Sequence, residues 1–273
     1  MKTVALIGYP LGHTISPAMH NAGYRHLKLD YEYVPLEVNP DDLKEAVDGL
    51  RALHFAGFNV TIPHKETIIP HLDDVTSLAR DIGAVNTVLN RDGKLIGFNT
   101  DGPGFIESLK FDAGFEPKGK NCLILGAGGA GRALAVSLQQ NEAKSISIYD
   151  PAVEKAENLA GYVGGKVVKD IQKEMNEANL LINASPIGMY PRVDNSPLPP
   201  GIKLHKKLCV YDIVYNPQET KLLGIAKQSG AKAVSGLGML VRQGALAFTV
   251  FTGHSAPFEV MWEAAKADLS AKI

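Results

Sequence analysis

The sequence is poor in features that mark several large classes of protein. Only two of its 273 residues are cysteines, Cys122 and Cys209, and each begins an apolar run, so we expect buried thiols and no disulfide. No stretch reaches the ~18 consecutive apolar residues that suggest a membrane span. The apolar run after Met1 is too short for a secretory signal. These absences predict a cytoplasmic protein without a membrane partner.

An excess of charge of one sign is also missing. The chain has 28 basic and 29 acidic residues and a formal net charge of -1, so it lacks the basic surface expected for nucleic-acid binding. Its eight histidines do not form a metal-ligand spacing, and we expect no metal. With 45% hydrophobic and 21% charged residues, the composition is that of a globular protein of one large or two ordinary domains. Monomer and homodimer both remain open.

The first hundred residues predict alternating strands and helices. Ser16-Pro17 is typical of a helix start, with Ser16 as the N-cap, and Asn39-Pro40 begins another helix. Asp92-Gly93 predicts a hairpin turn between the last two strands of this region. The predicted strands are Val4–Gly8, Tyr31–Pro35, Phe58–Ile62, Val85–Leu89 and Leu95–Asn99.

The second part of the chain has the order of a doubly wound parallel sheet. A strongly apolar strand, Cys122–Leu125, precedes a glycine turn and a helix, and strand and helix patterns then alternate. Met239–Phe251 and Phe258–Leu269 predict two closing helices. The later strands are Ser145–Tyr149, Leu180–Asn183 and Leu208–Val214, and the helices are Ala130–Gln140 and Val153–Leu159. The fold class predicted is α/β.

A glycine-rich segment follows the strongest strand. Gly126 to Gly131 reads Gly-Ala-Gly-Gly-Ala-Gly and fits the G-x-G-x-x-G pattern of dinucleotide-binding proteins. Glycines let the backbone turn tightly and approach a pyrophosphate, and the N-terminus of the following helix offers unpaired N–H groups to the anion. An ordinary glycine-rich turn is the alternative. The order of strand, turn and helix favours the cofactor site.

Asp150 ends the second strand of this region, near the ~20-residue spacing at which an acid binds the adenosine ribose. A carboxylate there accepts hydrogen bonds from the ribose hydroxyls and repels a 2′-phosphate. The nearest cation is Lys155, so the spacing favours NAD over NADP. The alternative is that Asp150 only caps the next helix, since it precedes Pro151.

Polar residues gather at the predicted ends of strands in the first hundred residues. They lie in the ranges 8–17 and 59–65 and, across the hairpin, in 86–87 and 99–101. Hydroxyls, amides and an ammonium donate to a carboxylate, and amides and an aspartate accept from ring hydroxyls. The combination therefore suits a small molecule that carries several hydroxyls and a carboxylate.

Lys65 is the candidate for proton transfer at a reacting alcohol. A nicotinamide moves the hydride, but a protein group has to manage the proton. A partly buried lysine is suited to this task because burial brings lysine pKa values toward neutrality. Asp101 is placed to orient it. The alternative is a solvated surface lysine, the commonest fate of this residue type.

Seven ordered segments resemble the shikimate dehydrogenase family over nearly the whole chain. GYPLGHTISPAMHN resembles its substrate motif, and GFNVTIPHK resembles the segment that ends in its catalytic lysine, here Lys65. The full set is GYPLGHTISPAMHN (8–21), GFNVTIPHK (57–65), GAVNT (83–87), GFNTDG (97–102), NASPIGM (183–189), YDIVYNP (211–217) and GLGMLVRQG (236–244). The resemblance implies NAD(P)-dependent reduction of 3-dehydroshikimate to shikimate, a step of aromatic amino-acid biosynthesis.

The resemblance also implies roles for individual residues. Lys65 and Asp101 form the catalytic pair, and Thr14 and Ser16 hold the substrate carboxylate. Other residues that it places around the substrate are Asn59, Thr61, Asn86, Tyr215 and Gln243. Those that it places at the pyrophosphate are Gly126, Ala127, Gly128, Gly129 and Ala130, and those beside the nicotinamide are Ile213, Gly236 and Met239.

Two domains follow from the resemblance. An N-terminal α/β substrate-binding domain covers residues 1–103 and is completed by helices in 238–273. A Rossmann-type domain with a doubly wound parallel sheet covers 104–237 and binds NAD(P). The active site is expected in the cleft between them, where closure excludes water.

Two departures from the family pattern bear on specificity. Thr14 stands where serine is usual, and its extra methyl alters the room for a substrate with one more hydroxyl. Asp150-Pro151-Ala152 stands where Asn-Arg-Thr is usual, so the arginine that binds a 2′-phosphate is missing. The second departure resembles the NAD-using quinate/shikimate dehydrogenase branch, and NAD is the cofactor we favour, with NADP at lower affinity.

Three alternative functions are weighed against this prediction. An NAD-dependent quinate dehydrogenase differs only by one saturated ring position and one hydroxyl of the substrate. A folate-type dehydrogenase also combines a Rossmann domain with a catalytic lysine, but the GxNVTxPxK and NTDG segments argue against it. A non-catalytic nucleotide-binding module would be favoured if Lys65 or Asp101 were missing, and both are present.

Overall fold

The computed structural model describes residues 1–12 and 14–271, and it divides into two compact units. Unit 1 comprises Met1–Gly104 and Val241–Ile273, and unit 2 comprises Phe105–Leu240. The chain passes between the units inside helix α4 (Asp101–Phe111) and again inside helix α9 (Leu237–Thr252). Residue 13, which belongs to the predicted substrate motif, lies outside the described residues.

Unit 1 contains a mixed six-stranded sheet with the order β2-β1-β3-β5-β6-β4. Strand β1 pairs in parallel with β2 and β3, and β5 and β6 form an antiparallel hairpin. At the hairpin turn, Asp92 and Gly93 both adopt positive φ, which confirms the predicted turn. The strands are β1 (Lys2–Gly8), β2 (Tyr31–Glu37), β3 (Gly57–Val60), β4 (Asp74–Val75), β5 (Thr87–Arg91) and β6 (Lys94–Phe98).

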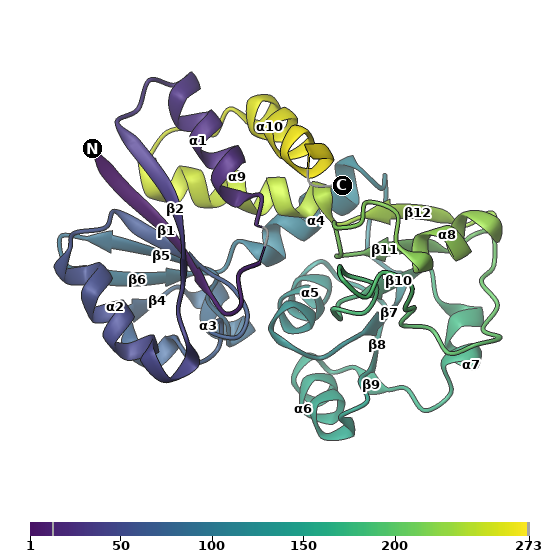
Figure 1. Ribbon diagram of the computed structural model, residues 1–273. Coiled ribbons are helices and arrows are strands. Elements are labelled where there is room, and N and C mark those ends of the chain that lie inside the picture. The colour runs from purple at the N-terminus through teal and green to yellow at the C-terminus, as the bar shows by residue number, and fades with distance from the viewer. Residues whose placement is uncertain (13, 272–273) are drawn as a thin grey trace. The chain divides into compact units, whose positions relative to one another are not determined.

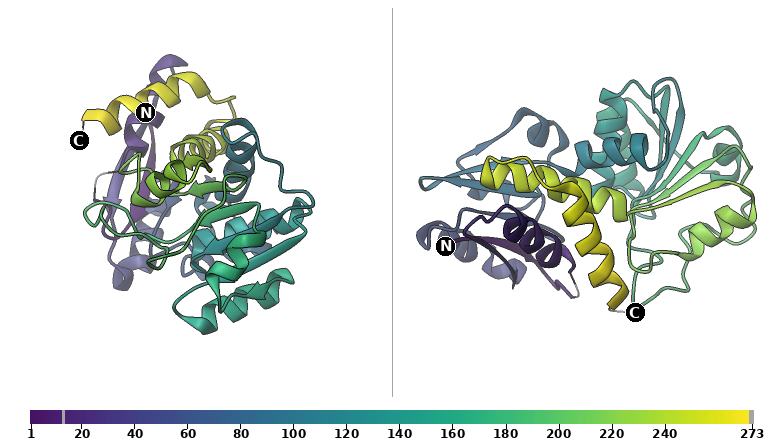
Figure 2. Two further views of the ribbon diagram at one scale, coloured as in Figure 1. Left: turned by 90° about the vertical axis from the view of Figure 1, so that its right-hand side faces the viewer. Right: turned by 90° about the horizontal axis from the view of Figure 1, so that it is seen from above.

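Helices cover both faces of the unit 1 sheet (Figures 1 and 2). Ala5 and Ile7 of β1 pack with Val47 of α2 in one hydrophobic core. Successive side chains of a strand point to opposite faces, so the alternate residues of β1 point to the other face of the sheet. Helix α1 lies on that face and packs on β2 and α10. The helices are α1 (Ser16–His26), η1 (Pro40–Asp42), α2 (Leu43–Ala52), η2 (Ile69–His71), α3 (Ser77–Ile82) and α10 (Phe258–Ala271).

The start of α1 differs in detail from the prediction. The N-cap residue is Ile15 rather than Ser16, and no side chain caps the helix. Ser16 is instead the first helical residue, and Pro17 follows it in the first turn, where its missing N–H has no cost. Asn39, by contrast, does cap η1, because its side chain accepts a hydrogen bond from the backbone N–H of Asp41. The hydroxyl of Ser16 is thereby released for other partners.

Unit 2 contains an all-parallel six-stranded sheet with the order β12-β11-β10-β7-β8-β9. The strand order reverses between β7 and β10, as in a doubly wound Rossmann sheet, and this confirms the predicted fold class. The strands are β7 (Asn121–Leu125), β8 (Ser145–Tyr149), β9 (Lys166–Val167), β10 (Leu180–Asn183), β11 (Cys209–Asp212) and β12 (Lys232–Ser235), and the helices are α5 (Gly129–Gln140), α6 (Val153–Val163), α7 (Ile171–Glu177) and α8 (Lys221–Gln228).

The core of unit 2 explains why its strands were predictable from the sequence. Leu123 of β7 packs in one hydrophobic core with Met175 of α7 and Leu222 of α8, so these strands are buried under helices and carry continuous apolar runs. Cys122 and Cys209 are free and buried, as expected. Burial raises the pKa of the Cys122 thiol to about 12 and that of Cys209 to about 11. Within the described part of the chain, no helix is long and apolar enough to cross a membrane.

Candidate active site

Lys65 and Asp101 form an ion pair in unit 1. Lys65 follows β3, and Asp101 is the first residue of α4. The Nζ atom of Lys65 lies 2.7 Å from Oδ2 of Asp101, and the two side chains are only 17% and 8% exposed. The structure therefore does not support the alternative of a solvated surface lysine. A charge-assisted hydrogen bond of this kind holds the ammonium in one place.

The second oxygen of Asp101 is also engaged. Asn86, at the start of the hairpin, donates from Nδ2 to Oδ1 of Asp101 at 2.9 Å and also contacts Oε1 of Gln243 at 3.3 Å. The backbone N–H of Thr100 donates to Oδ1 of Asn86 at 2.7 Å. The amide of Asn86 thus connects the predicted catalytic pair to Gln243, which is predicted to bind substrate.

Asn99 was not among the predicted site residues, although it orients one of them. Its side-chain oxygen accepts from the backbone N–H groups of Asp101 at 3.0 Å and Gly102 at 3.2 Å, and its Nδ2 donates to the carbonyl of Ala84. This is the bonding of a helix cap, and it fixes the first turn of α4 on which Asp101 stands. The sequence signal was available, because asparagine two residues before an aspartate at a helix start is a capping pattern.

Asn59 is buried at the carboxyl end of β3, and 7% of it is exposed. Its Nδ2 donates to the carbonyl oxygen of Asn86 at 3.0 Å and to Oγ1 of Thr87 at 2.9 Å. Two residues on, the backbone N–H of Thr61 donates to the carbonyl of Ile7 in β1. The ends of β1, β3 and β5 are therefore joined around Asn59.

The chain after β1 supplies the predicted carboxylate-binding hydroxyls. Ser16 is 8% exposed, and its backbone N–H donates to Oγ1 of Thr14 at 3.3 Å. A methyl on Gly8 would lie 2.4 Å from Cγ2 of Thr61, so a glycine is needed where this segment passes β3. Thr14, Ser16 and Thr61 all belong to segments that leave the carboxyl ends of β1 and β3.

In unit 2, the glycine-rich loop connects β7 to α5. Gly126 has a φ of +112°, a conformation that L side chains rarely adopt, and a methyl on it would lie 2.9 Å from the carbonyl carbon of Ala184. A methyl on Gly131 would lie 2.2 Å from the carbonyl oxygen of Gly126. The loop thus turns tightly and the helix packs against it. No side chain caps α5 at Gly128, and its first turn carries no acid. This arrangement fits a pyrophosphate.

Asp150 lies against this loop. Its Oδ2 accepts a hydrogen bond from the backbone N–H of Ala127 at 2.8 Å, and its Oδ1 accepts from that of Ala152 at 2.8 Å. The N-cap residue of α6 is Ala152, without a side-chain cap, so Asp150 does not have the helix-capping role considered as its alternative. A negative charge therefore stands beside the glycine loop at the end of β8.

A buried carboxyl group that the sequence analysis did not single out organises the loops after β10 and β11. Asp212 is fully buried and accepts from Oγ1 of Thr220 at 2.6 Å, Nδ2 of Asn183 at 2.9 Å and the backbone N–H of Val214 at 3.1 Å. Burial raises the pKa of Asp212 to about 6, although these three hydrogen bonds oppose the shift. Nδ2 of Asn183 also donates to the carbonyl of Ile187, so the two loops are tied together.

The residues predicted beside the nicotinamide follow β11 and β12 and lie at the start of α9. A methyl on Gly236 would lie 2.0 Å from the carbonyl oxygen of Ile213, so the end of β12 packs directly on the loop after β11. Met239 follows in α9 and is 7% exposed. Burial also raises the pKa of Tyr215. The predicted residues of unit 2 therefore include Tyr215 as well as the cofactor set, whereas the other predicted substrate residues belong to unit 1.

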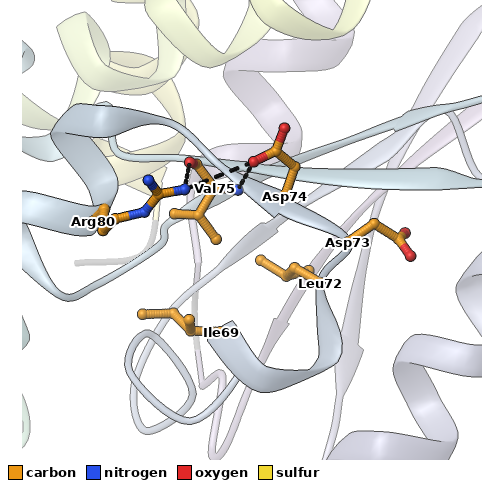
Figure 3. A pocket seen from close by; sticks show the side chains of 6 residues that line it. All are labelled: Ile69, Leu72, Asp73, Asp74, Val75 and Arg80. Atoms are coloured by element: carbon orange, nitrogen blue, oxygen red, sulfur yellow. Dashed lines mark hydrogen bonds and ion pairs between the residues drawn. The ribbon is translucent and has the colours of Figure 1, made fainter.

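Two surface pockets lie apart from these clusters. One of about 330 Å³ lies in unit 1 (Figure 3), where Arg80 donates to the carbonyl of Val75 at 3.0 Å and lies 3.8 Å from Asp74. The other, of about 400 Å³, is lined in unit 2 by residues 176–179 and 205–207. Neither contains a predicted site residue. Among the described residues, no group of three or more His, Cys, Asp or Glu side chains is arranged to hold a metal ion.

Comparisons with known proteins identify the same family in successive parts of the chain. Three family models match: the shikimate dehydrogenase substrate binding domain at residues 6–88, shikimate / quinate 5-dehydrogenase at 110–218, and the shikimate 5'-dehydrogenase C-terminal domain at 236–266. A shikimate dehydrogenase (NADP(+)) of Methanopyrus kandleri is 47% identical over 96% of this chain and 94% of its own.

Two solved structures are similar to this chain in both sequence and fold. The shikimate 5-dehydrogenase of Thermus thermophilus, in complex with NADP(H) and shikimate, is 39% identical, with a TM-score of 0.91 over 98% of this chain and 100% of its own. The shikimate 5-dehydrogenase of Listeria monocytogenes, in complex with shikimate and NAD, is 36% identical, with a TM-score of 0.88 over 96% of each chain. The relatives named as NADP enzymes do not support the NAD preference expected from Asp150, although they do support a nicotinamide cofactor. The resemblance noted in the sequence is confirmed: this chain belongs to the shikimate dehydrogenase family.

Proposed function

We propose that this protein is a shikimate dehydrogenase that interconverts shikimate and 3-dehydroshikimate with NAD(P). The observation that carries the proposal is the Lys65–Asp101 pair, with its 2.7 Å contact, its low exposure and its link through Asn86 to Gln243. A partly buried lysine held by a carboxylate among amides and hydroxyls suits proton transfer at an alcohol of a polar substrate. The family membership supplies the substrate class.

The chemistry divides between the cofactor and the chain. A bound nicotinamide accepts or supplies the hydride, and the glycine loop of unit 2 fits its pyrophosphate. During reduction, the ammonium of Lys65 gives a proton to the oxygen of the forming alcohol. During oxidation, Nζ first releases a proton to water and then, as the neutral amine, receives the proton of the reacting hydroxyl. Asp101 keeps Nζ in position, and while Nζ is protonated and donates to the alcohol oxygen, Asp101 accepts the hydrogen bond of the same hydroxyl.

The remaining predicted residues bind the substrate. Thr14 and Ser16 donate their hydroxyls to its carboxylate, and Asn59, Thr61, Asn86, Tyr215 and Gln243 contact its ring hydroxyls and carboxylate side. Unit 1 is then the substrate-binding domain and unit 2 the NAD(P)-binding domain. The match of residues 6–88 to a substrate binding domain supports this division. The cytoplasmic location and the choice between monomer and homodimer stay predictions.

We also propose that NAD is preferred over NADP. The support is local, because the carboxylate of Asp150 sits against the backbone N–H of Ala127 in the glycine loop. In that position it accepts hydrogen bonds from ribose hydroxyls and repels a 2′-phosphate. Ile213, Gly236 and Met239 border the nicotinamide in this arrangement. NADP is then used at lower affinity.

The test is replacement of Lys65 with alanine. We expect turnover of shikimate to fall by about 10²–10⁴-fold, the usual contribution of a general acid–base group, while the dissociation constant for the cofactor stays within about twofold. Lys44→Ala is the matched control, because Lys44 is a 64% exposed lysine of unit 1. Equal turnover of the Lys65 and Lys44 variants would contradict the proton-transfer role of Lys65, whereas a wild-type protein without turnover would favour a nucleotide-binding module.

A further inference from the structure

A buried tyrosine of unit 1 holds one of the predicted substrate-binding residues from inside the protein. Tyr33 lies in β2 and is 2% exposed, and its hydroxyl donates to Oδ1 of Asn59 at 2.9 Å. The side chain of Ser16 lies close to the same phenol. Tyr33 thus contacts an amide for which the proposed function requires a defined orientation.

The register of the sheet explains why a tyrosine reaches so far. Tyr33 lies opposite Val4 of β1, and Asn59 of β3 lies opposite Leu6, so the side chains of Tyr33 and Asn59 point to the same face. Strands β2 and β3 flank β1 and are therefore about 9–10 Å apart, twice the spacing of neighbouring strands. A long side chain with a terminal hydroxyl crosses β1 and meets Asn59.

Two consecutive residues of α1 hold Tyr33 in this position. The side chain of Asn21 accepts from the backbone N–H of Tyr33 at 2.8 Å and donates to its carbonyl at 3.0 Å. The ring of His20 stacks on the ring of Tyr33, with centroids 4.3 Å apart and planes 8° from parallel. Burial lowers the pKa of His20 to about 3, so its ring is neutral. The last two residues of the segment 8–21, which the substrate roles leave unused, thus act on Tyr33.

Hydrogen bonds connect Asn59 to the proposed catalytic pair. Asn59 donates to the carbonyl of Asn86 and to Oγ1 of Thr87, and Asn86 in turn donates to Asp101. Burial raises the pKa of Tyr33 well above its ordinary value, so the phenol remains a hydrogen-bond donor. Without that donor, Oδ1 of Asn59 loses its hydrogen bond, and only the Nδ2 side of the amide remains held.

We propose that Tyr33 is a positioning residue for substrate binding, which acts through Asn59 and is itself fixed by His20 and Asn21. The proposal rests on the proposed function, because it concerns the same site. Tyr33 itself is buried. Since Asn59 does not transfer the proton, loss of the phenolic hydroxyl weakens substrate binding more than it slows the chemical step.

The experiment compares Tyr33→Phe with Tyr24→Phe. Tyr24 is a matched control, because it is 1% exposed, belongs to the same aromatic cluster, and its hydroxyl has no hydrogen-bond partner among the described residues. For Tyr33→Phe we expect the KM for shikimate to rise about five- to tenfold, as one buried hydrogen bond implies, while kcat changes by less than about twofold and the cofactor KM is unchanged. Tyr24→Phe is expected to leave all three constants unchanged.

The outcomes separate this inference from the proposed function. A wild-type enzyme that does not oxidise shikimate would contradict the proposed function. An active wild type in which Tyr33→Phe and Tyr24→Phe share the wild-type KM, whatever their melting temperatures, would overturn the positioning role alone. Should Tyr33→Phe not fold, Asn21→Ala is used instead, because it removes the two hydrogen bonds that the Asn21 side chain makes to the backbone of Tyr33. It is expected to raise the shikimate KM about two- to threefold, and an unchanged KM in that variant would equally overturn the inference.

Discussion

Units 1 and 2 position their functional groups by different means. In unit 1, side chains orient other side chains: Asn86 donates to Asp101, which binds Lys65. In unit 2, the predicted cofactor site is the glycine loop between β7 and α5, which is made largely of backbone, and the glycines at 126 and 131 permit its close approaches. A side-chain network is sensitive to the loss of a single donor or charge. A backbone cradle is sensitive to added volume. The contrast predicts that substitutions in unit 1 change catalysis and substrate binding, whereas those in the glycine loop change cofactor binding.

After Lys65→Ala, the largest effect is expected for Asp101→Asn. The variant keeps the size of the side chain but removes the charge that holds Lys65, whose Nζ lies 2.7 Å from Oδ2. We expect kcat for shikimate oxidation to fall about 10²-fold or more, while the cofactor dissociation constant remains within about twofold. Steady-state rates and a fluorescence titration of the reduced cofactor measure the two quantities. A kcat near that of the wild type would remove Asp101 from the catalytic pair.

The next effect distinguishes two glycines of the cradle. In Gly131→Ala the new methyl lies 2.2 Å from the carbonyl oxygen of Gly126, so the backbone has to move, and we expect a loss of stability of about 1–3 kcal/mol together with weaker cofactor binding. Gly128 is the control for stability, because a methyl there meets nothing within 4 Å. Thermal melting of both variants measures the difference. If Gly128→Ala were as unstable as Gly131→Ala, packing of the loop would not be the cause.

A smaller effect concerns the choice of cofactor. Asp150→Asn removes one negative charge beside the glycine loop but keeps an oxygen that accepts from the N–H of Ala127. We expect the ratio of kcat/KM for NADP to that for NAD to rise about tenfold, because the repulsion of the 2′-phosphate disappears. An unchanged ratio would mean that Asp150 has no part in cofactor selection.

The last effect concerns stability rather than activity and is a dependence on pH that comes from Asp212. Its folded-state pKa of about 6 lies above the ordinary value of 3.8, so its contribution to stability is fully present below about pH 4 and is lost as the pH rises to about 6. The shift corresponds to about 3 kcal/mol. Asp212→Asn lacks this loss, so its stability relative to the wild type should increase between pH 4 and 6. Denaturant unfolding at several pH values measures it, and a constant difference would contradict the raised pKa.

Much of the fold was predictable because its signals are local. The Asp92-Gly93 hairpin turn, the buried strand Cys122–Leu125 and the glycine pattern that follows it each depend on neighbouring residues. The start of α1 was less accurate, since a serine followed by proline fits either an N-cap or a first helical residue, and the structure has the latter. Local patterns therefore identify elements well and their first residue less well.

The supporting side chains were not predictable, because their contacts depend on sheet register. Tyr33 meets Asn59 across β1, 26 residues apart in sequence, only because both point to the same face. Asp212 and Asn183 meet because β10 and β11 pair in register, 29 residues apart. Lys65 and Asp101 were expected to act together from the residue chemistry, with a surface role for Lys65 left open by the spacing and disfavoured by the family resemblance. The structure places them 2.7 Å apart, and their catalytic role stays a prediction.

The central claim is that this chain oxidises shikimate with a nicotinamide cofactor. The most direct measurement is the initial rate of the purified protein on shikimate or quinate, each with NAD or NADP. The account predicts the highest rate for shikimate with NAD and a lower one for shikimate with NADP. Faster turnover of quinate than of shikimate would contradict the substrate assignment, and no activity with any of the four combinations would contradict the account as a whole.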